Sequence, residues 1–437
     1  MDRVISPTSS VRGTFRLPGD KSISHRYAML AAVANGRTEI DNYSTGADCA
    51  STLECLRALG VPVERSGNCV VIEGVGPAGL SAPARVLDAG NSGSTIRMLS
   101  GILAGQPFEC EIGGDESLSR RPMERIIGPL EQMGASFTAQ DRGCPPLKIR
   151  GGNLRPIEYR LPVASAQVKT TVLFAGMFAD GTTTVDEPLS TRNHSEIALR
   201  EFGADLEVDG LSIRITGRTR LRGQQLRVPA DLSSAAFFIA AGLLLPESHI
   251  TLEGVGLNRT RAALLDVLRG MGADLEIVRG STFHGELAGD IEVRSASAVS
   301  SVAGPEPLLA GGVIDGATTA GVIDEIPMLA VLGAASRDGL IIRDAAELRV
   351  KETDRIATVA DNLQRMGVEV EVYDDGMKIA GRQHFRAAKL DSFGDHRIAM
   401  AFAVAALCAD GPSVIENAEA ASVSFPEFYD LLSSMTH

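Results

Sequence analysis

The chain has 437 residues, more than one hydrophobic core usually supports, so we expect roughly two or three domains. Apolar residues make up 44% and charged residues 22% of the sequence, a composition that excludes a disordered or fibrous chain. A net charge of −13, no Trp and only 4% aromatic residues argue against nucleic acid as a partner. An anionic ligand would therefore need local clusters of Lys and Arg.

The apolar stretches and the cysteines indicate a protein of the cytoplasm. The longest apolar stretches, residues 235–246 and 399–409, are too short to cross a bilayer and predict buried helices, with no membrane partner. The N-terminus shows no secretory signal. The six cysteines form no CxxC pair, which indicates reduced thiols and predicts no metal centre.

One pattern recurs along the chain: an amphipathic segment, a Gly, an Ala or Val, and a short β-type run. Its glycines are Gly60, Gly134, Gly203, Gly272 and Gly367. Each copy predicts a helix that ends at a left-handed glycine and is followed by a strand. A sixth helix is predicted in FPEFYDLLSSM, so the sequence predicts six αβ units of roughly 70 residues, three per domain.

Two segments rich in Pro, Gly and Asp mark candidate domain junctions, residues 18–20 and 228–231. They predict one domain from residues 21–229. The second domain would join residues 1–20 to residues 230–437.

The first half of the chain places cationic and hydroxyl side chains at predicted helix starts. In LPGDKSISHR, Lys21, Ser22 and Arg26 follow a Pro-Gly turn, where backbone N–H groups of the helix attract an anion. A capped helix with solvated charges is the alternative. GNSGSTIR repeats the arrangement with Asn91 and Gly93, and lacks the ending of a Walker A loop.

Three further groups in this half carry polar side chains. Arg121, the second Arg of RRP, suits bidentate binding of a carboxylate, although adjacent arginines are more often merely exposed. SAQVK and STRNH offer Ser165, Gln167 and Arg192 at helix starts, and the hydroxyl and amide groups of these motifs suit a polyhydroxylated ring. His194 has no second His at ligand spacing, so it is predicted to be a capping or surface residue rather than a metal ligand.

The second half adds acids to the cations. Asp324 in IDEIP is either the N-cap of an apolar helix or a general base. In RVKETDR, Lys351, Glu352 and Arg355 either place two cations around one acid or form a solvated salt-bridge network. Arg397 in GDHR lies near the anion-attracting end of a buried helix. If these helix ends converge in one cleft between the domains, the cleft would bind small, multiply anionic molecules.

The motifs LPGDKSISHR, GNSGSTIR, RRPMERI, SAQVK, IDEIP, RVKETDR and GDHRIAMAFA occur in the order found in enolpyruvylshikimate phosphate synthases, which the sequence resembles from residue 12 to residue 426. The resemblance implies an α/β protein with the two-domain enolpyruvyl transferase fold, an inside-out α/β barrel of six βαβαββ-type units with the active site between the domains. It also implies transfer of the enolpyruvyl group of phosphoenolpyruvate to the 5-hydroxyl of shikimate 3-phosphate, without a metal or organic cofactor.

The resemblance assigns residues to both substrates. Those implied for shikimate 3-phosphate are Lys21, Ser22, Arg26, Ser165, Ala166, Gln167, Arg192, Asp324 and Lys351. Those implied for phosphoenolpyruvate are Lys21, Asn91, Gly93, Arg121, Gln167, Glu352, Arg355 and Arg397. The reaction needs a base and an acid, for which Asp324 and Glu352 are the candidates, and Lys21 can stabilise the leaving phosphate.

The sequence departs from the best-known family pattern at Ser94, at Ala166, and at Val423, where many members carry Lys. SAQVK, TRNH and IDEIP resemble a second, divergent class, whereas Gly93 is the residue of the common class. The resemblance places Gly93 against glyphosate, an inhibitor that occupies the phosphoenolpyruvate site. Because Gly93 has no Cβ, we expect an enzyme that glyphosate inhibits.

Two alternatives to this function remain at the level of the sequence. The sister enzyme that transfers enolpyruvyl to UDP-N-acetylglucosamine has a reactive cysteine in the loop before its Arg-Pro, and GGDESLSRRP contains none. A catalytically silent protein that binds sugar phosphates would not need both Asp324 and Glu352. We expect a monomer.

Overall fold

The computed structural model describes residues 1–295 and 309–436, which form two compact units. Unit 1 comprises Met1–Leu17, Ala230–Ser281 and Leu287–His437, and unit 2 comprises Pro18–Pro229 and Thr282–Glu286. Unit 2 begins at Pro18, three residues before the boundary expected from the sequence, and the N–H of Asp20 donates to the oxygen of Pro229 at 2.8 Å. It also includes a short segment, Thr282–Glu286, that the sequence-based boundaries assigned to the other domain.

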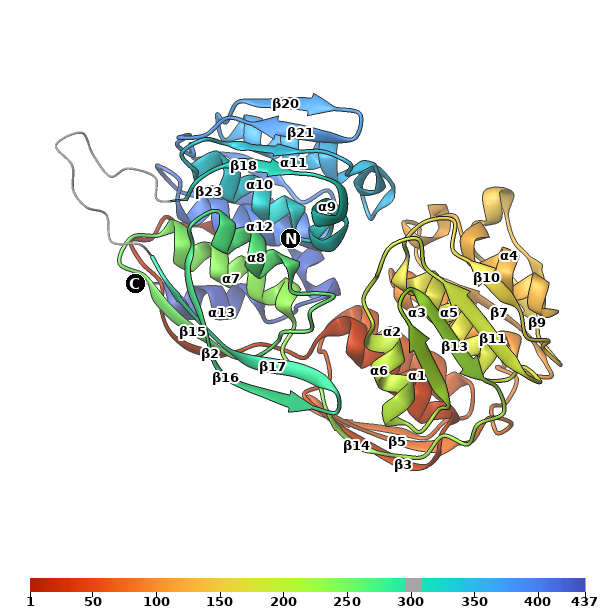
Figure 1. Ribbon diagram of the computed structural model, residues 1–437. Helices are drawn as coiled ribbons and strands as arrows, with labels where there is room; N and C mark the ends of the chain where they lie inside the picture. The colour runs from red at the N-terminus through yellow and green to blue at the C-terminus, as the bar shows by residue number, and fades with distance from the viewer. Residues whose placement is uncertain (296–308, 437) are drawn as a thin grey trace. The chain divides into compact units, whose positions relative to one another are not determined.

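Unit 2 contains three four-stranded sheets (Figure 1). Their strand orders are β14 (Gln225–Arg227), β3 (Asn35–Asp41), β5 (Cys69–Val75), β4 (Val63–Ser66); β6 (Leu87–Asp88), β7 (Glu109–Gly113), β9 (Leu147–Arg150), β8 (Ser136–Thr138); and β10 (Glu158–Arg160), β11 (Thr182–Asp186), β13 (Ser212–Thr216), β12 (Leu206–Asp209). In each sheet the first two strands are parallel and the later pairs are antiparallel.

The described residues of unit 1 form three more sheets with a related order. These are β2 (Arg12–Arg16), β15 (His249–Gly256), β17 (Glu286–Arg294), β16 (Asp274–Phe283); β18 (Gly312–Ile314), β19 (Leu340–Ile342), β21 (Gly376–Ile379), β20 (Val370–Tyr373); and β22 (Lys389–Asp391), β23 (Ser413–Glu416), β1 (Arg3–Ile5). The first two strands of each sheet are again parallel.

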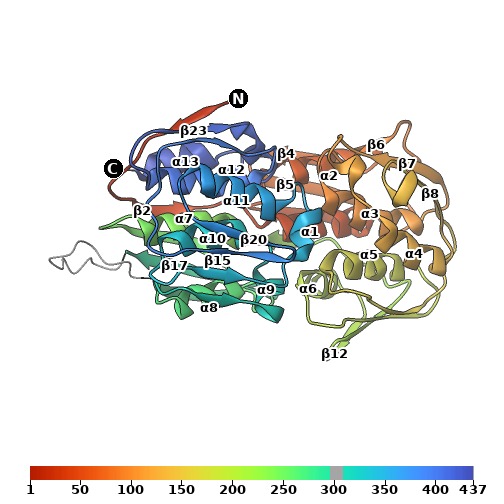
Figure 2. The same cartoon turned by 90° about the horizontal axis from the view of Figure 1, so that it is seen from above.

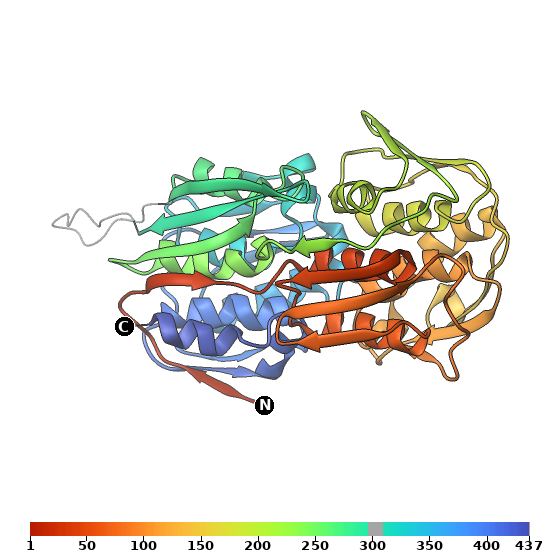
Figure 3. The same ribbon diagram turned by 90° about the horizontal axis from the view of Figure 1, so that it is seen from below.

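Two strands have exchanged places between the first and fourth repeats. In the other four repeats, the strand before the first helix pairs with the strand after it, as β6 pairs with β7. Strand β2, however, precedes α1 (Lys21–Val33) but pairs with β15, and β14 takes its place beside β3. Figure 3 shows the red strand β2 beside the green strand β15. This exchange explains why the chain passes between the units near residues 18 and 229.

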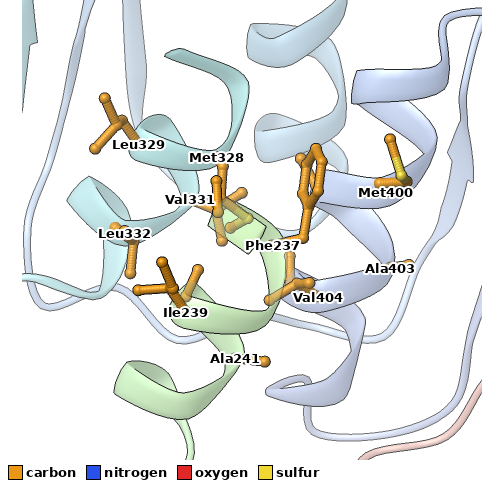
Figure 4. Packing of buried hydrophobic residues seen from close by; sticks show 14 of the residues in the cluster. Phe237, Ile239, Ala241, Met328, Leu329, Val331, Leu332, Met400, Ala403 and Val404 are labelled. Carbon is orange, nitrogen blue, oxygen red and sulfur yellow. The ribbon is translucent and has the colours of Figure 1, made fainter. Parts of the chain in front are cut away.

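In the part of the chain that the structure describes, each unit has three helices that are buried on nearly all sides. In unit 2 they are α1, α3 (Gly93–Ala104) and α5 (Ala166–Gly176), and Figure 2 shows α3 alongside α5. In unit 1 they are α7 (Leu232–Leu244), α10 (Ile326–Ala335) and α12 (His396–Leu407). Figure 4 shows Phe237 of α7, Val331 of α10 and Val404 of α12 in the core that these helices form.

The remaining helices bury only part of their surface. They are α2 (Ala47–Ala58), α4 (Glu124–Met133), α6 (His194–Glu201), α8 (Ala263–Gly270), α9 (Gly316–Val322), α11 (Arg355–Arg365) and α13 (Phe428–Met435). Short 3-10 helices cover Leu118–Arg120, Asp141–Gly143, Ala346–Val350 and Ala418–Val423. With buried helices and surrounding sheets, the six predicted repeats and the predicted fold class are confirmed.

The five repeat glycines have the left-handed conformation that the pattern predicts. Their φ angles are +86° for Gly60, +111° for Gly134, +90° for Gly203, +86° for Gly272 and +83° for Gly367. A residue without Cβ adopts this conformation at little cost, which ends each helix and starts the following strand.

Within residues 1–295 and 309–436, no single helix has the length and apolar character needed to span a membrane. Helices α9 and α10, which are bent relative to each other, have the required length and apolar character only when the two are counted together.

Candidate active site

Helix α1 begins between two carboxylates. Asp20 caps the helix because its side chain accepts a hydrogen bond from the N–H of Ile23 at 2.9 Å. Nζ of Lys21 lies 3.0 Å from Oδ2 of Asp48, which belongs to the first turn of α2. The ammonium group is therefore held where the N–H groups of α1 also favour an anion. The side chain of Asp48 was not among the residues identified from the sequence.

Arg26 lies in α1 and is buried. Its Nε donates to Oγ of Ser195 at 2.7 Å, its Nη2 to Oγ1 of Thr170 at 2.9 Å, and its Nη1 to the backbone oxygen of Ser22 at 2.8 Å. Burial, with a smaller contribution from the nearby charge of Arg192, lowers the pKa of Arg26 to about 10. The guanidinium is therefore charged at neutral pH and held in one orientation, so the alternative of a solvated charge is wrong for Arg26.

Asn91 and Arg121 meet just before α3. Nη2 of Arg121 donates to Oδ1 of Asn91 at 2.8 Å, and its Nη1 donates to the backbone oxygen of Asn91 at 3.3 Å. Nδ2 of Asn91 in turn donates to Oδ2 of Asp115 at 2.7 Å. Arg121 is only 8% exposed, so the alternative of an exposed arginine is wrong.

Gly93 is the first residue of α3, and little space surrounds its Cα atom. A Cβ atom there would lie 2.7 Å from Nη1 of Arg97 and 3.5 Å from Nη1 of Arg121. The same Nη1 of Arg97 donates to Oε1 of Gln167 at 2.9 Å, and Nε2 of Gln167 donates to Oγ of Ser94 at 2.9 Å. The predicted residues Gly93 and Gln167 thus lie close together, linked by Arg97, which belongs to the motif GNSGSTIR but was not among the residues assigned to a substrate.

Helix α5 begins with partly exposed residues and carries a buried ion cluster within its first turn. Oγ of Ser165 accepts a hydrogen bond from the N–H of Val168 at 3.4 Å and caps the helix, and Ala166 is its first residue. Lys169 is fully buried, with Nζ 2.7 Å from Oε1 of Glu196 and 3.0 Å from Oε2 of Glu187. Its charge therefore joins α5 to α6.

His194 does not lie on the surface. Asn193 occupies the N-cap position of α6, and His194 follows it with a side chain that is 2% exposed. Nδ1 of His194 lies 2.7 Å from Oε1 of Glu286, at the end of the segment that unit 2 receives from the second half of the chain. The prediction of a capping or surface residue is therefore wrong, because a partner far away in the sequence buries the imidazole.

In unit 1, Asp324 lies among three of the predicted cations. Its Oδ1 is 3.7 Å from Nζ of Lys351 and 3.8 Å from Nη1 of Arg355. Its Oδ2 is 3.9 Å from Nη2 of Arg397. Glu325, not Asp324, occupies the N-cap position of α10, so the alternative of a capping role for Asp324 is wrong.

Arg355, the first residue of α11, joins two acids. Its Nε donates to Oδ2 of Asp395 at 2.7 Å, and its Nη2 donates to Oε2 of Glu352 at 2.6 Å. Burial alone would lower the pKa of Arg355, but Asp395 and Glu352 raise it above its ordinary value. The Glu352 side chain remains 21% exposed and is oriented by the Arg355 side chain, which is 1% exposed. The alternative of a solvated network is therefore wrong for Arg355.

Arg397 lies in the first turn of α12 and also contacts the turn before α10. Its Nη1 donates to the backbone oxygen of Asp324 at 2.6 Å and lies 3.3 Å from Oε1 of Glu325. Its Nη2 donates to Oγ of Ser233 at 3.1 Å. Sequence reasoning did not assign Ser233, Arg261 or Glu325 to the site, because the three are far apart in the chain and only Glu325 lies in a motif, IDEIP.

Each unit thus gathers cations and hydroxyl groups at the starts of its buried helices. Such groups suit phosphate and carboxylate, since helix N–H groups and guanidinium groups both bind oxyanions. Asp324 and Glu352, two carboxylates close to one guanidinium, supply groups that can accept or donate a proton.

Known proteins are similar to this chain in both fold and sequence. The fold is similar to that of the enolpyruvyl transferase NikO from Streptomyces tendae, with a TM-score of 0.79 and 20% identity over 99% of this chain and 96% of that chain. The EPSP synthase from Acinetobacter baumannii has a TM-score of 0.87 and 40% identity, over 100% of this chain and 98% of that chain. A 3-phosphoshikimate 1-carboxyvinyltransferase of Solibacter usitatus (strain Ellin6076) is 61% identical over 99% of both chains.

The architecture, with its cationic groups at the starts of buried helices, is that of an enolpyruvyl transferase. Residues 5–432 match the family model of EPSP synthase (3-phosphoshikimate 1-carboxyvinyltransferase). The chain belongs to the EPSP synthase family, and the resemblance inferred from the motifs is confirmed.

Proposed function

We propose that the protein transfers the enolpyruvyl group of phosphoenolpyruvate to the 5-hydroxyl of shikimate 3-phosphate and releases inorganic phosphate, a step of chorismate and aromatic amino acid biosynthesis. One observation carries the proposal beyond family membership. Arg355 approaches both acids, with Nη2 2.6 Å from Oε2 of Glu352 and Nη1 3.8 Å from Oδ1 of Asp324. An acid and a base near one buried cation are what this addition and elimination require.

Most of the site residues are assigned to one substrate, and Lys21 and Gln167 are assigned to both. Shikimate 3-phosphate binds Lys21, Ser22, Arg26, Ser165, Ala166, Gln167, Arg192, Asp324 and Lys351. Phosphoenolpyruvate binds Lys21, Asn91, Gly93, Arg121, Gln167, Glu352, Arg355 and Arg397. The buried, hydrogen-bonded guanidinium groups of Arg26, Arg121 and Arg355 support these assignments, because held cations bind anions without losing side-chain entropy.

The chemistry follows from the two acids. The 5-hydroxyl oxygen bonds to C2 of phosphoenolpyruvate as Asp324 takes the hydroxyl proton and Glu352 gives a proton to the methylene carbon, which yields a tetrahedral intermediate. Glu352 then takes a proton back from the methyl group as the bond between C2 and the phosphate oxygen breaks. The proton that Asp324 took passes to the departing phosphate, so that both acids return to their starting states. Lys21 stabilises the negative charge that develops on the leaving phosphate.

We further propose that residues of both units bind the substrates together, with the domains bounded near residues 20 and 229. The assigned residues support this, since Lys21 to Arg192 belong to unit 2 and Asp324 to Arg397 belong to unit 1. We also propose that the protein works as a monomer in the cytoplasm, where its six free cysteines would stay reduced.

A phosphate-release assay with phosphoenolpyruvate and different acceptors tests the function. Release with shikimate 3-phosphate and none with UDP-N-acetylglucosamine supports the proposal. The reverse result would favour the sister reaction. Binding of shikimate 3-phosphate without release with either acceptor would identify a silent binding protein and overturn the proposal.

A further inference from the structure

A buried polar cluster lies next to Arg397 in unit 1. It consists of Ser233 in α7, Arg261 just before α8 and Glu325 just before α10, and each of these residues is at most 6% exposed. Arg261 binds both oxygens of Glu325, with Nη1 2.9 Å from Oε2 and Nη2 2.8 Å from Oε1. This is the bidentate geometry in which a guanidinium and a carboxylate bind most strongly.

Arg397 is paired less closely with carboxylates than its neighbours are. The carboxylate oxygens nearest to its guanidinium in the described part of the chain are Oε1 of Glu325, at 3.3 Å, and Oδ2 of Asp324, at 3.9 Å. Arg355, by contrast, has carboxylate oxygens at 2.6 and 2.7 Å. Because attraction between charges weakens with distance, Arg397 keeps more of its positive charge available to an anion.

The hydroxyl of Ser233 contacts both arginines and Glu325. Its Oγ donates to Oε1 of Glu325 at 2.6 Å and accepts from Nη2 of Arg397 at 3.1 Å. It also accepts from Nη2 of Arg261. A hydroxyl has one donor and two acceptor positions, so all of its hydrogen-bonding capacity is used. The hydroxyl thus aligns Arg397 while Glu325 stays paired with Arg261.

We propose that Arg261 is a positioning residue for phosphoenolpyruvate: it holds Glu325 in a bidentate pair, so that Glu325 makes only its one long hydrogen bond with Nη1 of Arg397, at 3.3 Å, and does not form a closer ion pair with it. The inference rests on the proposed function. It implies that Arg261 acts on phosphoenolpyruvate binding through Glu325. If a variant at position 261 weakens phosphoenolpyruvate binding, removing the charge of Glu325 should therefore restore it. A purely structural pair could show such a reversal in stability, so the readout that decides is the KM for phosphoenolpyruvate in variants that are folded.

Two variants and one control test the proposal. In Arg261→Gln, Glu325 is released and turns to Arg397, so the KM for phosphoenolpyruvate should rise about tenfold, the scale of one weakened charge-assisted hydrogen bond. The buried Glu325 keeps Arg397 as a partner, so this variant should fold. Binding of shikimate 3-phosphate alone, measured by calorimetry, should not change. Arg269→Gln, which removes an exposed Arg from α8, is the matched control.

The double variant Arg261→Gln with Glu325→Gln removes one buried positive and one buried negative charge. Arg397 then has no competing carboxylate at position 325, and the KM for phosphoenolpyruvate should return to within about threefold of the wild-type value. An unchanged KM in Arg261→Gln, or a double variant as impaired as the single one, overturns the proposal.

Folding and function are checked separately. Thermal unfolding of each variant is compared with wild type, and Arg261→Lys replaces Arg261→Gln if the latter does not fold. Lys keeps the charge but cannot bind both oxygens of Glu325, so a smaller rise in KM is expected, and no rise overturns the proposal. If the wild-type protein itself shows no turnover with shikimate 3-phosphate, the proposed function fails rather than the role of Arg261.

Discussion

Nε of Arg355 lies 2.7 Å from Oδ2 of Asp395, and the two side chains are 1% and 0% exposed. Asp395 also caps α12, because its Oδ1 accepts a hydrogen bond from the N–H of Arg397 at 2.8 Å. One buried carboxylate thus connects the start of α11 to the start of α12. These two helix starts carry three of the residues assigned to phosphoenolpyruvate, Glu352, Arg355 and Arg397.

The Asp395 carboxylate should make stability depend on pH. Burial alone would raise the pKa of Asp395, but Arg355 outweighs it, and the pKa lies below its ordinary value. A carboxyl whose pKa is lower in the folded state stabilises the fold above its unfolded pKa of about 3.9, and this contribution is lost as the pH falls further. Asp395→Asn should therefore reduce the free energy of unfolding by about 3–5 kcal/mol at neutral pH.

The difference between wild type and Asp395→Asn should shrink as the pH falls below about 4. Urea unfolding at several pH values measures it, with Asp266→Asn, an 83% exposed acid on α8, as control. A difference that stays constant down to strongly acidic pH would contradict a role for the ionised carboxylate.

Asp324 and Glu352 should both be needed for turnover. Asp324→Asn and Glu352→Gln should each lower kcat by roughly 10²-fold or more, the scale of general acid–base catalysis, while shikimate 3-phosphate still binds. Phosphate release and calorimetry measure the two effects. Asp338→Asn, at a half-exposed acid beyond α10, serves as control. Near-normal kcat in both variants would rule out the assigned roles.

Gly93→Ala should weaken glyphosate more than phosphoenolpyruvate. The new methyl group would lie 2.7 Å from Nη1 of Arg97, the end of a flexible side chain, so Arg97 must shift and disturb its hydrogen bond with Gln167. One methyl clash with a tightly fitting ligand costs about 1–3 kcal/mol, or roughly 5-fold to 150-fold in affinity. Glyphosate, which the family resemblance describes as slightly longer than phosphoenolpyruvate, should lose more affinity than the substrate.

Inhibition constants for glyphosate, measured in competition with phosphoenolpyruvate, decide this point. The control is Gly128→Ala in α4, where the added Cβ would meet no atom within 4 Å apart from its chain neighbours and the backbone of its own helix. A wild-type enzyme that tolerates glyphosate, or an Ala variant inhibited as strongly as wild type, would show that Gly93 is not the determinant.

Glu286 should hold the segment Thr282–Glu286 in place through His194. Glu286→Gln replaces a buried carboxylate 2.7 Å from the imidazole by a neutral amide, and should lower stability by about 1–3 kcal/mol. Hydrogen exchange at residues 282–286 should become faster. Glu276→Gln, at an exposed position of β16, should change neither quantity. Unchanged exchange in Glu286→Gln would mean that other contacts hold this segment.

Local features of the fold could be predicted from the sequence because they depend on neighbouring residues. The glycines that end the helices, such as Gly134 and Gly367, act through their own backbone conformation. The cationic residues at helix starts act through the N–H groups of the same turn, so Lys21 and Arg397 could be recognised from their motifs. The family motifs added the substrates, which residue types alone did not define.

Tertiary structure alone decided the pairings between distant residues. The exchange of β2 and β14 between two sheets is a matter of strand pairing, since β2 pairs with β15 and β14 with β3, and the sequence of a short strand does not identify its partner. The partners Arg261 and Glu325 are 64 residues apart, and His194 and Glu286 are 92 apart. A buried charge is tolerated only when packing brings it a partner, and packing depends on the whole chain rather than on the residues beside it.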